Sequence, residues 1–326
     1  MSEILLSVKN LIKDFPIKAG FFNREIGAIH AVNNVSFDIN KGETLGLVGE
    51  SGCGKSTTGR CVLGLIPATS GEVLFGGTNI LTHDKKEQKN LRKRMQIVFQ
   101  NPYSSLNPRM KIKEILSEPF IVHGERSKEN INNRINELAD MTGLAKDSLN
   151  RYPHEFSGGQ RQRIVIARAL ALNPEFIVAD EPVSALDVSI QAQIINLMEE
   201  LKNELGLTYL FISHDLSIVK YVSTRVAVMY LGEIVELADC DELYNNPKHP
   251  YTQVLLSSNP IANPKANTSG RIILKGDLPS PSNPPSGCKF HTRCPYVMDI
   301  CKGNPPPSYD VSLNHYARCY LLNPDL

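Results

Sequence analysis

The chain has 326 residues, of which 41% are hydrophobic and 21% are charged, values typical of a globular protein with a hydrophobic core. The formal net charge of +1 gives no overall basic field, so binding to nucleic acid is not expected. The first residues lack the features of a signal peptide, and no apolar run approaches the roughly 20 residues of a membrane helix. We therefore expect a cytosolic protein that acts on a membrane only through partners.

Three apolar runs have the character of buried parallel strands: 44–48, 176–179 and 209–213. The first ends at a glycine-rich loop, the second at two acidic residues and the third at a histidine. Such runs, followed by helical segments, predict an α/β sheet that is covered on both faces. Since ligands collect at the carboxyl ends of parallel strands, a functional site is expected there.

Other segments predict the surrounding structure. Alternation over 31–39 indicates an antiparallel strand with one face in solvent. The segment from about Gln100 to Leu172 is expected to be helical, with one apolar face formed by Ile131, Ile135, Leu138 and Met141. Prolines become dense after about Asn259, which predicts a domain over 1–258 and a loop-rich extension over 259–326.

The segment Gly49–Ser56 fits the pattern G-x-x-x-x-G-K-[ST] after a predicted strand. Its glycines let backbone N–H groups surround phosphate oxygens, Lys55 supplies positive charge and the hydroxyl of Ser56 can bind Mg²⁺. The following helix points its positive dipole end at the phosphates. The residues predicted to bind ATP here are Gly49, Glu50, Ser51, Gly52, Cys53, Gly54, Lys55, Ser56 and Thr57. Cys53 is expected to serve only as a small residue in this loop.

Two acidic residues end the second predicted strand. Asp180 is placed to hold Mg²⁺ through water, and Glu181 to polarise the attacking water as general base. An apolar strand ending in two acids is commonplace, but beside a phosphate loop it predicts a nucleotide hydrolase.

The sequence Phe156-Ser157-Gly158-Gly159-Gln160 narrows this prediction. Ser157 and Gln160 form an S-x-x-Q capping box, so a helix should start there, and the two glycines leave its first N–H groups uncovered as an anion site. A second anion site is useful if it faces the γ-phosphate held by a different subunit.

These motifs resemble the signature set of the ABC ATPases, and the resemblance covers the whole chain. It implies a P-loop (RecA-like) α/β core, an antiparallel β subdomain and a helical signature subdomain over about 101–172. It also implies that Gln100 contacts Mg²⁺, that Asp187 belongs to the loop that crosses to the partner subunit, that His214 bonds the γ-phosphate and that Phe15 stacks on adenine. The catalytic residues that it implies are Glu181, His214 and Gln100. Ser56, Gln100 and Asp180 would then surround Mg²⁺.

Five further stretches resemble the ATPases of oligopeptide and dipeptide importers. They are residues 100–109, 151–157, 184–193, 249–252 and 279–288. The insert at about 18–29 resembles the F-type member of that family, although its Phe21-Phe22 pair has no assigned role. The resemblance implies two membrane permease subunits, a second D-type ATPase as heterodimer partner, an external binding protein, and a place on the cytoplasmic face of the membrane. The segment after Gln100 would receive a short helix of the permease.

Four cysteines lie in the proline-rich tail: Cys288, Cys294, Cys301 and Cys319. In a reducing cytosol, clustered thiols are first considered as metal ligands. Four thiolates suit Zn²⁺ or a [4Fe–4S] cluster, and the resemblance favours the cluster, in a structural or regulatory role. His291 and His315 leave a Cys/His zinc site open, and unligated buried thiols are the third possibility.

Three alternatives to a peptide importer make different predictions for the sequence. A soluble ABC ATPase acting on nucleic acid or ribosomes would usually carry two cassettes or a long coiled coil, and this chain has neither. A GTPase would need an Asn-Lys-x-Asp motif, which is missing. An importer of nickel, sugar or another solute stays open, because the motor does not touch the cargo.

Overall fold

The computed structural model describes residues 3–20, 24–82, 85–258 and 276–325. The chain divides into two compact units, each discontinuous in sequence. The first unit comprises Met1–Ile4, Ile39–Glu43 and Thr82–Ile212. The second comprises Leu5–Asp38, Thr44–Leu81 and Ser213–Leu326.

Three parallel strands form the sheet of the first unit. Strand β7 (Phe176–Asp180) pairs with β6 (Met95–Val98) on one side and with β8 (Thr208–Ser213) on the other. Every residue of β7 and β8 is buried, because neither face of these strands meets solvent. The predicted buried parallel strands are confirmed here.

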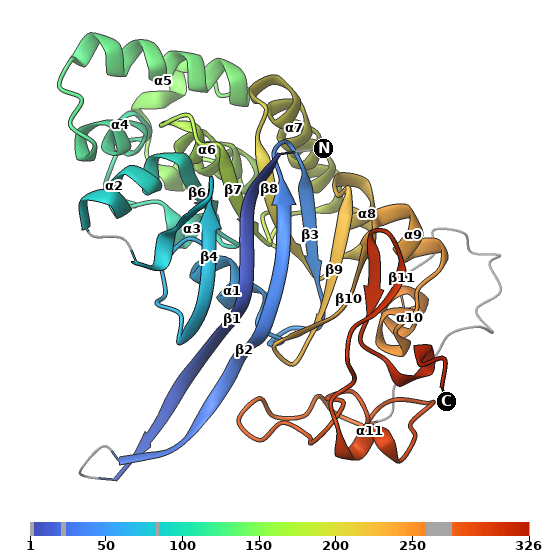
Figure 1. Ribbon diagram of the computed structural model, residues 1–326. Helices are drawn as coiled ribbons and strands as arrows, with labels where there is room; N and C mark the ends of the chain where they lie inside the picture. The colour runs from blue at the N-terminus through green and yellow to red at the C-terminus, as the bar shows by residue number, and fades with distance from the viewer. Residues whose placement is uncertain (1–2, 21–23, 83–84, 259–275, 326) are drawn as a thin grey trace. The chain divides into compact units, whose positions relative to one another are not determined.

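Helices make up most of the rest of the first unit, as predicted for 100–172. They are α2 (Lys85–Arg94), α3 (Pro102–Ser105), α4 (Ile112–Val122), α5 (Lys128–Thr142), α6 (Gly158–Leu170) and α7 (Val188–Leu205). Helices α4, α5 and α6 pack on one another (green in Figure 1). The predicted apolar face of α5 is buried at Ile131, Ile135 and Leu138, and half-buried at Met141.

The second unit contains a mixed sheet. Strand β3 (Thr44–Val48) runs parallel to β9 (Arg225–Tyr230), which is antiparallel to β10 (Glu233–Asp239). The tail adds β12 (His315–Ala317) to β10, and β11 (Tyr309–Ser312) pairs with β12. The helices of this unit are α1 (Lys55–Val62), α8 (Leu216–Val222), α9 (Cys240–Asn245), α10 (Pro250–Ser257) and α11 (Ile300–Gly303). The described part of the tail therefore belongs to the same unit as the phosphate loop.

A four-stranded sheet completes the second unit, in the order β2 (Arg24–Asn40), β1 (Ile4–Ala19), β4 (Ser70–Phe75), β5 (Thr78–Asn79). The pairs β1–β4 and β4–β5 are antiparallel. In β2 buried and exposed side chains alternate as expected from Val35 to Ile39. Before this stretch the alternation is interrupted at Asn34, which has a left-handed backbone with φ +51°. Phe21 and Phe22 of the insert, and the predicted domain boundary at 259, lie outside the described residues.

Short 3₁₀ helices connect some of these elements. They span Ile80–Thr82, Lys146–Asn150, Pro153–Glu155 and Tyr320–Leu322. Among the described helices, none combines the length and the apolar composition needed to cross a membrane.

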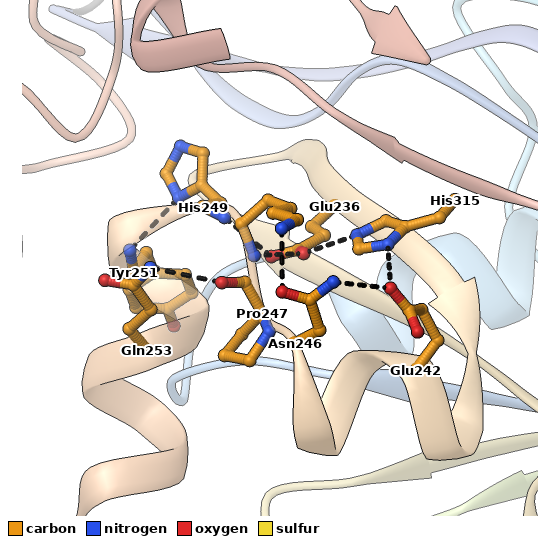
Figure 2. A network of polar contacts seen from close by, with 9 residues as sticks. Glu236, Glu242, Asn246, Pro247, His249, Tyr251, Gln253 and His315 are labelled. Carbon is orange, nitrogen blue, oxygen red and sulfur yellow. Dashed lines mark hydrogen bonds and ion pairs between the residues drawn. The ribbon is translucent and has the colours of Figure 1, made fainter. Parts of the chain in front are cut away.

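A buried polar network joins the tail to the rest of the second unit (Figure 2). The fully buried carboxylate of Glu236, in β10, accepts a hydrogen bond from His315 Nε2 of β12 at 2.8 Å. It also accepts from the backbone N–H groups of Lys248 and His249 at 2.7 and 2.9 Å. A buried carboxylate is tolerated only with such partners, so the network fixes the tail strand and the start of α10 together.

His249 ends this network as the N-cap of α10. Its Nδ1 accepts a hydrogen bond from the N–H of Tyr251 at 3.1 Å, which requires an unprotonated Nδ1. Burial lowers the pKa of His249 from 6.5 to about 4, outweighing the opposite effect of the Glu236 carboxylate. The folded protein therefore holds this ring neutral.

This low pKa predicts an acid-dependent loss of stability. Below about pH 6.5 the unfolded chain binds a proton at His249, whereas the folded chain does not bind it until the pH approaches 4. The free energy of unfolding should therefore fall by about 2 kcal/mol at this site between pH 7 and pH 5. Denaturant unfolding of wild type and His249→Asn at both pH values measures it, since Asn can still cap α10. An equal pH dependence in both proteins would contradict the prediction.

Candidate functional site

The phosphate loop joins β3 to α1 and is shaped by glycines that touch neighbouring backbone. Gly49 has φ +153°, and a Cβ there would lie 2.1 Å from the carbonyl oxygen of Met229. Gly54 has φ +104°, and its Cβ would lie 2.0 Å from the carbonyl oxygen of Ala31. Any side chain at either position would displace the loop, so its backbone keeps this path only with glycine.

Lys55 lies at the centre of this loop and is almost fully buried. Its ammonium group donates to the carbonyl oxygens of Gly49 at 2.8 Å and of Glu50 at 3.0 Å. Helix α1 starts at Lys55, and its N-cap Gly54 has no side chain to cap the first N–H groups. Ser56 and Thr57 follow, half-buried in the first turn of α1. A buried ammonium and a helix N-terminus together favour a phosphate group.

Cys53 is 1% exposed, and burial raises the pKa of its thiol although Lys55 opposes this shift. The residue is therefore a neutral, packed thiol, in keeping with the prediction that it acts as a small residue.

Two side chains that the sequence did not single out as site residues contact this loop. The hydroxyl oxygen of Tyr251 accepts a hydrogen bond from the N–H of Glu50 at 2.8 Å. The guanidinium of Arg293 donates to the Glu50 carboxylate. No local sequence pattern predicts these contacts, because Tyr251 and Arg293 are 201 and 243 positions away from Glu50.

The two acidic residues lie at the carboxyl end of β7, in the first unit. Asp180 is buried, and the next residue, Glu181, adopts a left-handed backbone with φ +48°. The N–H of Glu181 donates to the carbonyl oxygen of Ile212 at 3.0 Å, which holds this conformation. The side-chain amide of Gln100 donates to the Glu181 carboxylate at 2.7 Å. The structure thus brings together two of the predicted catalytic residues, with backbone strain of a kind that clusters at active sites.

The signature segment, also in the first unit, forms the predicted capping box. Ser157 Oγ accepts from the N–H of Gln160 at 3.3 Å, and Gln160 Oε1 accepts from the N–H of Ser157 at 3.0 Å. Both glycines pack closely around the start of α7. A Cβ on Gly158 would lie 3.2 Å from Leu186, just before the helix, and one on Gly159 would lie 2.5 Å from Ile190 in its first turn. Helix α6 therefore begins where predicted.

The remaining predicted site residues occupy chain positions that fit their expected roles, which stay predictions. His214 is exposed directly after β8, and Asp187 precedes the first turn of α7. Phe15 lies in β1 with 36% exposure, and the Lys13 ammonium lies 4.8 Å from its ring centroid.

The four tail thiols line one cavity, together with His249, Phe290 and His291. Burial raises the pKa of Cys288 to about 11 and of Cys319 to about 12, and neighbouring thiols add to both shifts. Within the described residues, no group of three or more His, Cys, Asp or Glu side chains is arranged to hold a metal ion. His315, an alternative ligand in the sequence-based prediction, is instead paired with Glu236. The cavity supplies suitable donor atoms, but not a formed ligand geometry.

Comparison with known proteins identifies the family. Residues 32–184 match the ABC transporter model, and residues 235–301 match the model for the oligopeptide/dipeptide transporter C-terminal region. Over 323 residues the chain is 54% identical to the oligopeptide transport ATP-binding protein AppF of Bacillus subtilis (strain 168), covering 98% of each protein. The chain belongs to the ABC transporter family.

Other relatives agree with this assignment. The putative peptide import ATP-binding protein BOV_A0347 of Brucella ovis is 51% identical over 319 residues, with 98% of each protein covered. Among solved structures, the dimeric ATP-binding cassette MJ0796 bound to ADP and Pi is 32% identical, with a TM-score of 0.64. That match covers 72% of this chain and 98% of the other. The predicted fold class, an ABC cassette built on a P-loop α/β core, is confirmed.

Proposed function

We propose that this chain is the ATP-hydrolysing motor subunit of a membrane importer of oligopeptides or dipeptides. The observation that carries the proposal is the full-length similarity to proteins named for peptide import, in a chain that keeps a formed phosphate loop. Nickel or sugar import is the alternative, because none of the described site features would contact a cargo.

ATP is the substrate of the proposed reaction. The loop N–H groups and Lys55 would bind the phosphates, and Phe15 would stack on the base. Ser56, Gln100 and Asp180 would hold Mg²⁺, which would neutralise charge on the phosphates. Glu181 acts as general base on the attacking water, and His214 bonds the γ-phosphate. The contact between Gln100 and Glu181 supports this assignment, since a residue that senses the nucleotide would then also hold the base.

The signature residues Ser157, Gly158, Gly159 and Gln160 would contact ATP held by a second ATPase subunit. Ser157 and Gln160 are exposed at the start of α6, which supports this role, because one cassette has no need of two anion sites within its own chain. The proposed partners are two permease subunits and a D-type ATPase, with this chain as the F-type member of the ATPase pair. An external binding protein would deliver the peptide to the permease subunits. The chain would then lie peripherally on the cytoplasmic face of the membrane, and ATP binding and hydrolysis would close and reopen the pair.

The base assignment predicts a specific defect for Glu181→Gln. In the importer reconstituted with its partners, this variant should still bind ATP but lose ATP turnover and peptide uptake by at least about a hundredfold, the scale of lost general-base catalysis. The control is Glu175→Gln, which removes an acid just before β7 that pairs with Arg94 on the surface. Wild-type turnover in Glu181→Gln would refute the role of Glu181. Turnover without peptide uptake in the wild-type complex would instead point to another cargo.

We also propose that Cys288, Cys294, Cys301 and Cys319 hold a [4Fe–4S] cluster of structural or regulatory role. The shared cavity supports this, because the four thiols line it together. Burial raises the pKa values of Cys288, Cys294 and Cys319, and a bound cation would let these thiols ionise. The thiolates would anchor the cluster, and no step of ATP hydrolysis passes through it.

Metal analysis of anaerobically purified protein tests this second proposal. About four iron and four sulfide per chain are expected in wild type. Cys301→Ser should lose them, while Cys240→Ser, which changes a buried cysteine outside the cavity, should retain them. About one zinc per chain, or no metal at all, would contradict the cluster.

A further inference from the structure

The phosphate loop is contacted by a turn near the far end of the chain. Arg293 Nη1 donates to both carboxylate oxygens of Glu50, the second residue of the loop, at 3.1 and 2.9 Å. The Arg293 side chain is 9% exposed and that of Glu50 24% exposed. Because this ion pair is largely removed from water, loss of one partner would leave the other charge poorly compensated.

Buried aromatic rings fix the turn that carries Arg293. Phe290 is 1% exposed and packs edge-on against Tyr230, with ring centroids 5.2 Å apart. Its ring also lies 5.4 Å from that of Tyr251. The N–H of Arg293 donates to the carbonyl oxygen of Phe290 at 3.0 Å, so the packed ring sets where the guanidinium lies.

Glu50 is held at three separate points. Arg293 binds its carboxylate, Tyr251 accepts from its N–H, and Lys55 donates to its carbonyl oxygen. Tyr251 is fully buried and packs against Phe290, the residue that also holds the turn of Arg293. The contacts that Tyr251 and Arg293 make with Glu50 therefore depend on the same group of packed aromatic rings. A shift of Glu50 would therefore move an acceptor of the phosphate-binding ammonium of Lys55.

We infer that Arg293 is a positioning residue for nucleotide binding: it neutralises and orients the Glu50 carboxylate so that the phosphate loop can receive a polyanion. This inference rests on the proposed ATP-binding function. Without Arg293, an uncompensated negative charge would stand next to Gly49 and oppose a triphosphate electrostatically.

A second tail arginine provides a matched control. Arg318 Nη1 lies 3.1 Å from a carboxylate oxygen of Glu233 in β10, and both side chains are mostly buried. Loss of Arg318 also breaks an ion pair between the tail and the body of the second unit. Glu233 is outside the phosphate loop, so Arg318→Gln weakens the anchoring of the tail without changing a contact of the loop. Comparison of its Kd for ATP with that of Arg293→Gln therefore separates the two effects.

Titration of the purified full-length chain with a fluorescent ATP analogue and Mg²⁺, in competition with ATP, tests the inference. Arg293→Gln should raise the Kd for ATP about tenfold, the loss expected for one charge-assisted contact. Arg293→Lys should raise it only about threefold, because the charge remains. Arg318→Gln should stay within about twofold of wild type, and thermal unfolding of each variant verifies folding.

A rescue experiment distinguishes positioning from a structural role. If Arg293 acts by neutralising Glu50, the double variant Glu50→Gln/Arg293→Gln should bind ATP at least about threefold more tightly than Arg293→Gln alone, because the unpaired charge is gone. The inference is overturned if Arg293→Gln binds ATP like wild type, if Arg318→Gln weakens binding equally, or if the double variant shows no recovery. A wild-type chain that fails to bind ATP would instead refute the proposed function.

Discussion

The close approach of backbone to backbone around the phosphate loop is the constraint on which the rest of the site depends. Gly49 and Gly54 touch the carbonyl oxygens of Met229 and Ala31, so the loop rests against two other segments of its unit. Lys55 is buried within this loop, and its ammonium donates to the carbonyl oxygens of Gly49 and Glu50. The path of the loop is therefore set by contacts within its own unit.

The tail contributes to this same unit. Strand β12 extends the mixed sheet through β10, and the Glu236–His315 pair fixes it from within. Phe290 and Arg293 then extend this support to Glu50. The tail thus contacts the phosphate loop directly, through Arg293 and Glu50.

Much of the fold could be predicted because its signals are local. The uninterrupted apolar runs predicted β3, β7 and β8, and the Ser157–Gln160 capping box predicted the start of α6. These features depend only on neighbouring residues, whose spacing and hydrogen-bonding groups determine local structure.

Features that depend on tertiary contacts could not be predicted. The left-handed φ of Glu181 is held by Ile212, and that of Asn34 shifts a strand pattern that otherwise alternates. His315 looked like a possible metal ligand from its place near cysteines, yet it pairs with Glu236 across two strands. The contact of Arg293 with Glu50 joins residues that no sequence motif links.

The most direct test of the central claim is to purify the tagged chain from gently solubilised native membranes and identify its partners by mass spectrometry. A motor subunit of a peptide importer should co-purify with two membrane permeases and a second, related ATPase. Recovery only from the soluble fraction, together with ribosomal or nucleic-acid-binding proteins, would contradict the transport function and leave an ABC ATPase with a different task.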